Sequence, residues 1–458
     1  MATSYITRTP GSSGNRKKWT LSGWYKFNMS TLASGYWANT LFCGSNGTNY
    51  MECSVNNASF MDWVQSTGGL VARRTTNRKF RDQSAFYHFV WVWDSENATP
   101  ADRMKIYVNG VQQTSFSATT DPSSGLDSDW NFTYPIFLGS SNGGSPYYNG
   151  VMSNVQFVDG SALAPTEFGQ FNSTDGMWEI KTDAYATPGA QGFFLKMEDS
   201  TNLDLDSSTN AHTFSTTGTL ISTKDNPSNN LCTNNWVNPT VDTTNDSIKN
   251  IGNTALVQQA SFRSVLGTLG VQAGKWYAEF KLRTAAGTSN YSGMGIVNVS
   301  QSPEYALGSA TTKKIGEYGN TVGYFSGGAV IRNASTVRTD STFTSEDIIS
   351  IAMDCDNGFV YWAKNNVWQN SGVPTSGATG TGGYNFFTYL GTGGIYVMGV
   401  TGRSGSSAPY FDVNWGNGAY ANANFGSPNA DDNGFGAFTY APPTGFLTMC
   451  TKNISTNG

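Results

Sequence analysis

Few residues of this chain have the types and spacing needed for catalysis. Its only two histidines are His88 and His212. His88 lies inside the apolar segment 86–94, which favours a buried imidazole with satisfied partners over a catalytic base, and His212 lies in a polar turn. A Ser-His-Asp triad or a histidine-rich metal site needs imidazoles beside a nucleophile or a metal. The sequence gives such sites little support.

One serine motif resembles a nucleophile site by its letters alone. Residues 139–143 read Gly-Ser-Ser-Asn-Gly and match G-x-S-x-G, with Ser141 at the centre. A nucleophile elbow needs a strand before this motif and a helix after it, whereas a Gly-Ser-Pro loop follows here. In a chain so rich in Gly and Ser, the match is expected by chance.

Carboxylates are the next candidates, because cleavage of a glycosidic bond requires two of them at a defined separation. The string "MEDSTNLDLD" at 197–206 contains the right letters at the wrong spacing. A glycan-cleaving enzyme therefore stays an unfavoured alternative, and we predict no catalytic residue.

No cofactor is predicted, except that a structural calcium ion stays open because hard oxygen ligands suit this cation. A metal site cannot be assigned to particular residues from the sequence. The acidic residues that qualify by type are Asp94, Asp121, Asp127, Asp129, Asp204 and Asp206. A turn-forming role is favoured for them, since Asp commonly bonds its own backbone in turns.

Aromatic side chains divide into two groups. Those on predicted strand positions should form cores, and they are Trp19, Trp24, Trp91, Trp93, Trp276 and Trp362. Those in or beside Gly/Ser-rich loops are the candidate binding residues, and they are Tyr36, Trp37, Trp63, Tyr147 and Tyr148. Exposed rings at the rim of a β-sandwich can stack on sugars or on a protein partner. The alternative, that they cover small cores of their own loops, stays open.

Composition narrows the function classes. The 458 residues include 52 glycines, 14% aromatic and only 13% charged residues, which favours many short strands joined by turns and argues against disorder. The net charge of −5 and the lack of a large basic patch argue against nucleic-acid binding. No apolar run is long enough for membrane insertion, and the N-terminus lacks the apolar segment of a secretory signal. We therefore expect synthesis in a cytoplasm, with five reduced, buried cysteines.

The first half reads as an antiparallel β-sandwich at 17–215, preceded by an N-terminal arm at 1–16 that is a candidate attachment element. Strand patterns occur at 17–27, 86–94 and 103–116, where Asn109-Gly110 predicts a hairpin turn. The motifs "WTLSGW", "HFVWVWD", "IYVNG" and "GVMSNVQF" resemble laminin-G or concanavalin A-like jelly rolls over roughly residues 15–170. Polar residues 216–250 predict a connector.

The second half, 251–458, predicts another sandwich with a C-terminal tail, so the fold class is all-β, with two antiparallel sandwiches in series. The strings "KWYAEF" at 275–280, "GMGIV" at 293–297 and "DCDNGFVYWAKNNVW" at 354–368 resemble the SPRY pattern. The chain departs from that pattern between 299 and 345, where any partner surface taken from other SPRY domains is in doubt.

The segment "FTYAPPTGFLTMC" at 438–450 resembles the terminal signature of structural proteins from tailed, especially marine, bacteriophages. The resemblance implies a non-enzymatic virion protein, made in the host cytoplasm and exposed on the particle as a tail fibre or receptor-binding component. Its partners would be other virion proteins and a host surface glycan or protein, and it would form a homo-oligomer, with a trimer favoured. A capsid decoration or head fibre is the main alternative, and a eukaryotic SPRY adaptor is a distant one.

Overall fold

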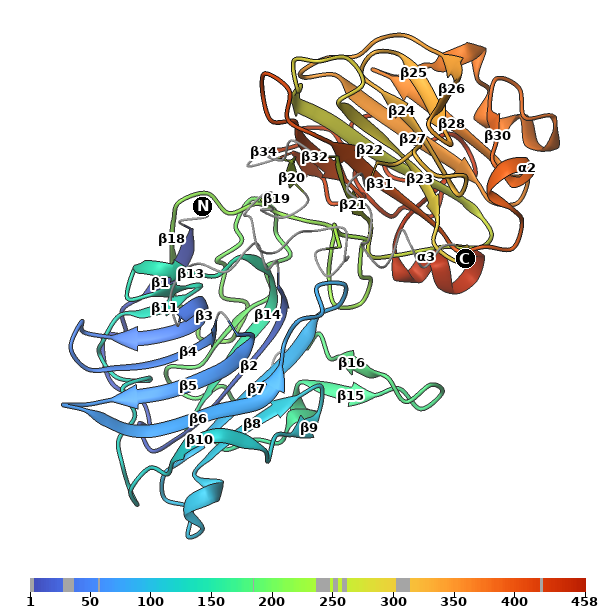
Figure 1. Ribbon diagram of the computed structural model, residues 1–458. Helices are drawn as coiled ribbons and strands as arrows, with labels where there is room; N and C mark the ends of the chain where they lie inside the picture. Colours follow the sequence, from blue (N-terminus) through green and yellow to red (C-terminus); the bar gives the residue numbers. More distant parts are fainter. Residues whose placement is uncertain are drawn as a thin grey trace. The chain divides into compact units, whose positions relative to one another are not determined.

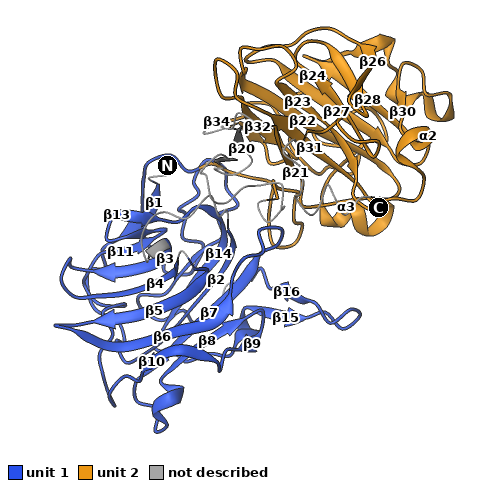
Figure 2. Ribbon diagram, viewed as in Figure 1, with its two compact units in different colours: residues 1–220 blue, residues 221–458 orange. Residues whose placement is uncertain are grey.

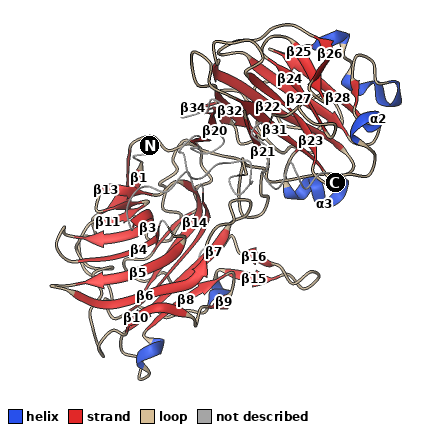
Figure 3. Cartoon of the chain, viewed as in Figure 1, coloured by secondary structure: helices blue, strands red, loops and turns tan. Residues whose placement is uncertain are grey.

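Alternating apolar residues along short strands build two antiparallel β-sandwiches, as the sequence predicts. The computed structural model describes residues 4–27, 37–56, 58–183, 185–235, 248–249, 254–257, 262–301, 314–420 and 423–458. The chain divides into two units, residues 1–220 and 221–458 (Figure 2). Strands dominate both units, and helices are short (Figure 3). The all-β prediction is confirmed.

The first unit contains two large sheets (Figure 1). The eight-stranded sheet has the order β10 (Phe116–Thr120), β6 (Leu70–Lys79), β5 (Phe60–Ser66), β4 (Tyr50–Asn56), β3 (Trp37–Ser45), β11 (Ile136–Leu138), β1 (Tyr5–Arg8), β18 (Ser215–Thr217). The six-stranded sheet has the order β17 (Phe193–Leu195), β14 (Gly150–Asp159), β2 (Lys18–Phe27), β7 (Tyr87–Asp94), β8 (Met104–Val108), β9 (Val111–Gln112). Two hairpins, β12 (Ser140–Ser141) with β13 (Gly144–Tyr147) and β15 (Gly169–Phe171) with β16 (Trp178–Ile180), complete the strands.

Tryptophans fill the core between these two sheets. Trp19 on β2 lies opposite Trp93 on β7, and their rings stack with centroids 6.3 Å apart. Trp63 and Trp130 contact Trp19 from the other side of the core, with centroid distances of 5.9 and 6.4 Å. All four are completely buried, and each ring contributes about 2–3 kcal/mol through its buried apolar surface.

The turn at Asn109-Gly110 joins β8 to β9 as predicted. Both residues have positive φ, 49° and 78°, the conformation of a type I′ turn, which Asn and Gly adopt readily. This turn sets the β8–β9 register, in which Val108 lies opposite Val111.

The outer face of the six-stranded sheet is also covered. Val90, Val92 and Val158 point away from the tryptophan core and pack against Phe168 and Leu163. The segment 163–168 supplies this cover and contains one short helix, η2 (Pro165–Glu167). Strands β2 and β7 are therefore buried on both faces.

The N-terminal residues do not form a separate arm, so this part of the predicted division is wrong. Strand β1 lies between β11 and β18, with Ile6 opposite both Leu138 and Thr216. Residues Tyr5–Arg8 are an interior strand because Ile6 adds to the apolar core. The predicted connector is also shorter than 216–250, since β18 belongs to the first unit and 221–235 to the second.

The second unit contains a nine-stranded and a six-stranded sheet. The first has the order β19 (Ile248–Lys249), β20 (Thr254–Val257), β32 (Tyr410–Asn414), β22 (Lys275–Thr284), β27 (Ile348–Asp354), β28 (Phe359–Lys364), β29 (Val367–Trp368), with β30 (Tyr384–Asn385) on β28 and β35 (Leu447–Thr448) on β22. The second has the order β21 (Arg263–Leu266), β31 (Tyr396–Gly402), β23 (Ser292–Asn298), β24 (Thr321–Phe325), β25 (Ala329–Arg332), β26 (Ser335–Thr339). Helices α2 (Phe387–Leu390) and α3 (Thr451–Asn457) and the hairpin β33 (Ala419–Tyr420)–β34 (Ala423–Asn424) lie outside these sheets.

The segment 429–450, here called the C-terminal strap, covers the outer face of the nine-stranded sheet. Phe438 and Phe446 pack on Tyr277, Ala352 and Tyr361 of that sheet. The sequence motif at 438–450 therefore has a structural role: it supplies the second buried face of β22 and β27.

A buried carboxylate fixes this strap. Glu279 on β22 is fully buried and accepts five hydrogen bonds. Two come from the backbone N–H groups of Thr439 and Tyr440, at 2.9 and 2.7 Å. The others come from the side chains of Tyr277, Asn414 and Tyr420. Burial raises the pKa of Glu279, although these donors oppose the shift.

All five cysteines are free and buried, which confirms the prediction of reduced, buried thiols. Cys43 and Cys53 are close but are not direct cross-strand partners, because Cys43 lies opposite Glu52 and Cys53 opposite Phe42.

The first prediction concerns Glu279. Because its pKa is higher in the folded than in the unfolded chain, its contribution to stability is present below the ordinary glutamate pKa and is lost as pH rises through the folded pKa. The difference in unfolding free energy between wild type and E279Q, measured in urea, should therefore decrease as pH rises from 4.5. E279A should destabilise the second unit by about 2–4 kcal/mol at neutral pH, because five buried donors lose their acceptor. A pH-independent difference for E279Q would contradict this assignment.

Candidate functional site

The outer face of the eight-stranded sheet carries a row of polar side chains across three strands. Residues Met51, Cys53 and Val55 of β4 face the core, so Glu52 and Ser54 face the opposite side. The same alternation places Asp62 of β5 beside Ser54, and Arg73 and Thr75 of β6 follow it. We call Glu52, Asp62, Arg73 and Thr75 the polar row.

Glu52 is held by hydroxyl groups from both sides. Thr40 Oγ1 donates to Oε1 at 2.9 Å, and Ser141 Oγ donates to Oε2 at 2.7 Å. Only 6% of Glu52 is exposed. Burial, together with the nearby negative charge of Asp62, raises the pKa of Glu52, and the hydroxyl donors oppose this.

Asp62 forms a two-point ion pair with Arg73. The Nε and Nη2 atoms of Arg73 lie 3.0 and 2.7 Å from Oδ1 and Oδ2 of Asp62, and Thr75 Oγ1 donates to Oδ1 at 2.7 Å. Asp62 is inaccessible, whereas 27% of the Arg73 side chain is exposed. Arg73 is thus the member of the row that reaches the surface, in an orientation fixed by Asp62.

Aromatic rings lie on the same outer face, beyond β3. Ile6 and Leu138 face the core, so Tyr5 of β1 and Phe137 of β11 face outward, with centroids 5.8 Å apart. Tyr147 of β13 stacks on Tyr5 at 6.4 Å. The β12–β13 hairpin connects these rings to the polar row, because Ser141 of this hairpin bonds Glu52.

Two of the five predicted binding aromatics are not surface residues, so these predictions are wrong. Trp63 lies on β5, not in a loop, and is completely buried in the tryptophan core. Tyr148 is 7% exposed, and its hydroxyl donates to the carbonyl groups of Lys26 and Val151. Both face the core because they occupy the apolar side of their segments.

Tyr147 is partly exposed and remains a candidate. Tyr36 lies outside the described residues, and for Trp37 only the backbone, at the start of β3, is described. Sequence reasoning missed the polar row and Tyr5. The alternation in "YMECSVN" at 50–56 and in "MDW" at 61–63 was the signal that could have found Glu52 and Asp62.

The aspartates considered for calcium are used by the protein itself. Asp121 pairs with Arg74, Asp94 with Lys18, and both Asp127 and Asp129 with Arg16. Asp206 accepts from the backbone N–H groups of Phe194, Ser208 and His212, and Asp204 accepts from Thr216. Among the described residues, no group of three or more metal-ligating side chains could hold an ion.

His88 is a structural histidine, as the sequence predicts. It is fully buried on the outer face of the six-stranded sheet, with Trp24 stacked 4.6 Å from its ring. Trp178 Nε1 donates to Nδ1 at 2.9 Å, and Nε2 lies 2.8 Å from Ser22 Oγ. Because an indole N–H can only donate, Nδ1 is the acceptor and Nε2 carries the proton. His88 therefore donates to Ser22 and cannot take its proton.

The G-x-S-x-G match is not a nucleophile elbow. Ser140 and Ser141 form β12, and the chain turns into β13 instead of a helix. The hydroxyl group of Ser141 donates a hydrogen bond to Glu52.

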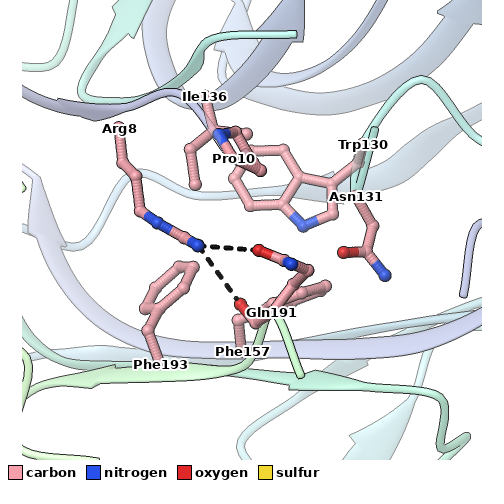
Figure 4. Close-up of a pocket in the computed structure, with 8 residues that line it drawn as sticks. All are labelled: Arg8, Pro10, Trp130, Asn131, Ile136, Phe157, Gln191 and Phe193. Carbon is pink, nitrogen blue, oxygen red and sulfur yellow. Dashed lines mark hydrogen bonds between the residues drawn. The ribbon is translucent and has the colours of Figure 1, made fainter. Parts of the chain in front are cut away.

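A small cavity lies under β1 in the first unit (Figure 4). Its free space of about 10 Å³ is the size of one water molecule. Arg8 crosses it and donates to the side chain and backbone of Gln191, and the buried Trp130 Nε1 and Asn131 Oδ1 have no partner. It is too small for a sugar.

Comparison with known proteins supports the fold of the first unit. Residues 1–167 match the family model of the concanavalin A-like lectin/glucanases superfamily, called Laminin_G_3. The search of curated proteins found no match.

Similar solved structures share low sequence identity with this chain. The SPRY domain of human HERC1 is 12% identical, with 35% of this chain and 86% of that chain covered and a TM-score of 0.26. The native heptameric SAP-like pentraxin from Limulus polyphemus is 15% identical, with 42% and 85% covered and a TM-score of 0.28. Domain 4 of AbnA, a GH43 extracellular arabinanase from Geobacillus stearothermophilus, solved with arabinotriose, is 19% identical, with 34% and 65% covered and a TM-score of 0.24. At such scores the likenesses say nothing about the function of this chain.

Finally, no helix in the described part of the chain is long and apolar enough to cross a membrane.

The second prediction concerns His88. Burial lowers its pKa to about 3 from the ordinary 6.5. The unfolded chain therefore binds a proton below about pH 6.5 that the folded chain does not bind until about pH 3. Its contribution to stability is lost as pH falls, by about 2–3 kcal/mol between pH 7.5 and 4.5. In urea unfolding, the loss of unfolding free energy between pH 7.5 and 4.5 should be smaller for H88Q than for wild type by this amount.

H212Q is the matched control, since His212 is only partly buried and its ring contacts the carbonyl of Ala190. This variant should keep most of the acid sensitivity. Equal pH profiles for wild type and H88Q would show that His88 is not buried in its neutral form.

Proposed function

We propose that the first unit is a non-enzymatic carbohydrate-binding module and that its outer eight-stranded face is the binding surface. The match of residues 1–167 to a lectin and glucanase superfamily supports a carbohydrate ligand. The observation that carries the proposal is the combination, on one sheet face, of the Tyr5–Tyr147 ring pair with a charged residue, Arg73, held in place by Asp62.

The two features suit different parts of a sugar. Ring faces stack on the apolar C–H groups of a pyranose, and a fixed guanidinium donates to hydroxyl or carboxylate oxygens. Tyr5 lies on β1 and Arg73 on β6. Strands β5, β4, β3 and β11 lie between β6 and β1 in the sheet, so five inter-strand spacings separate the two residues. At about 4.8 Å per strand, the two ends of the face are roughly 24 Å apart. An oligosaccharide chain, rather than a single sugar, is the ligand that could contact both ends.

Catalysis on this face is the second candidate function, favoured by one observation. The pKa of Glu52 is raised beside Asp62, which is the arrangement of a general acid near a second carboxylate. Against it, both carboxylates already accept from protein donors and are almost inaccessible. A glycosidic bond would have to reach Glu52 directly to be protonated. We therefore favour binding.

The place of the protein in a virus particle is a separate proposal. It rests on the resemblance of residues 438–450 to phage structural proteins, and we propose a surface-exposed virion component, a tail fibre or receptor-binding protein first and a head decoration second. A trimer or another homo-oligomer would suit this role, because single sugar contacts are weak and linked copies gain about 10²–10⁴ in avidity.

The third prediction tests glycan binding. Y147A should weaken retention of the chain on immobilised host polysaccharides about tenfold, because one stacking ring is worth roughly 1 kcal/mol or more. Y185A is the control, since Tyr185 packs on the outer face of the other sheet of the same unit. Equal binding by Y147A and wild type would exclude this surface. Release of reducing ends by the purified chain, abolished in E52Q, would replace binding with hydrolysis.

The fourth prediction tests the virion role. Gold-labelled antibodies to the purified chain should bind intact particles, at the tail for a receptor-binding protein or over the head for a decoration. Protein found in infected lysate but never on particles would overturn the virion proposal and leave the carbohydrate-binding proposal standing.

A further inference from the structure

Two cationic side chains meet at one end of the six-stranded sheet of the second unit. Arg403 directly follows β31, and Phe262 directly precedes β21, the neighbouring strand. Lys314 lies by Phe325, the last residue of β24, at 4.5 Å from Nζ to the ring centroid. We call Lys314 and Arg403 the cationic cluster.

Aromatic rings, rather than carboxylates, surround this cluster. The guanidinium of Arg403 lies 3.9 Å from the centroid of Tyr291 and 5.5 Å from that of Phe262. Lys314 Nζ lies 4.9 Å from the same Phe262 ring. Arg403 and Lys314 therefore share one ring, which brings two positive charges together.

No acidic side chain within the described ranges forms an ion pair with either cation. Burial lowers the pKa of Lys314, and the positive charge of Arg403 lowers it further, while Glu317 acts in the opposite direction. Unlike these two, Arg283 and Arg338 of the same unit each pair with an aspartate.

The cluster also contains a buried donor that the protein does not use. The Nε atom of Arg403 is buried and has no hydrogen-bond partner. The Nη2 atom of Arg403 donates to the hydroxyl of Tyr291. A buried N–H of a charged group is expensive to leave without an acceptor.

We propose that the cationic cluster is a binding site for an oxyanion, a sulfate, carboxylate or phosphate group. Such a group accepts hydrogen bonds only, from several directions at once, which matches one guanidinium group and one ammonium group. Its negative charge offsets the repulsion between the two cations. The surrounding rings limit the access of water, so each ionic contact is stronger than at an open surface.

The oxyanion could be a free ion or a substituent of an acidic polysaccharide. The second source alone rests on the proposed carbohydrate-binding function, and there the second unit would recognise the charge of the polymer while the first unit contacts its sugar rings. The site on the second unit does not require that the face around Tyr147 binds anything.

Thermal unfolding of the full chain tests the site with inorganic sulfate against chloride at equal ionic strength. Sulfate at about ten times its Kd should raise the second unit's Tm by about 2–5 °C in a saturable manner. R403Q and K314M should lose the saturable part and keep only the general salting effect. R332Q is the matched control, because Arg332 lies in the same sheet, stacks on Tyr389 at 4.3 Å and is not part of the cluster.

Retention on dextran sulfate and on neutral dextran separates the two sources. A saturable sulfate effect that depends on Arg403 assigns the site to free ions. Retention on dextran sulfate without a saturable sulfate effect assigns the site to a polymer, provided that R403Q and K314M lose this retention and R332Q keeps it. If R403Q and K314M behave as wild type in both experiments, the site does not exist. K314M also reports on folding, since removal of one like charge should leave the Tm in chloride unchanged or higher. Loss of polysaccharide binding in Y147A with a normal sulfate response would show that the proposed sites of the two units act independently.

Discussion

Both units depend on covering the two faces of their central strands. Strands β2 and β7 in the first unit, and β22 and β27 in the second, are buried on both sides, so each sheet has a second layer beyond its sandwich partner. In the first unit this layer comes from the segment around Phe168, and in the second from the C-terminal strap. The sheets that carry the proposed surfaces are held in position by these inner, doubly covered sheets.

Buried polar groups fix the positions that apolar packing leaves undefined. Glu279 accepts two backbone N–H groups of the strap and so sets its register on β22. Asp62 fixes the orientation of the Arg73 side chain, and the hydrogen bond from Trp178 fixes the tautomer of His88. In each case a hydrogen-bonding side chain holds a segment, a side chain or a tautomer in one arrangement out of several. Rigid surface groups of this kind lose little conformational freedom on contact with a ligand, which favours binding.

Much of the architecture could be predicted from the sequence because strand alternation and turn residues are local signals. The alternation at Trp19–Phe27 and the Asn109-Gly110 turn predict β2 and the β8–β9 hairpin, and the structure confirms both. Trp63 shows the limit of this reasoning: its neighbours Ser66, Gly68 and Gly69 suggest a loop, whereas its pairing with Cys53 places it within the sheet. The prediction of an N-terminal arm is wrong for the same reason, because the strands that pair with β1 come from distant residues, 136–138 and 215–217. The cationic cluster joins residues 314 and 403 through the ring of Phe262, and no local pattern connects positions so far apart.

The strap also has a consequence for how the chain is made. Glu279 and Tyr277 are synthesised about 150 residues before the strap residues that cover them. While the ribosome completes the intervening strands, the outer face of β22 and β27 is exposed to solvent, with the Glu279 carboxylate and the Tyr277 ring uncovered. The first unit is complete by residue 220 and can fold during translation. The second must wait for its last strands, so the nascent chain passes through a stage in which chaperones have an apolar surface to bind.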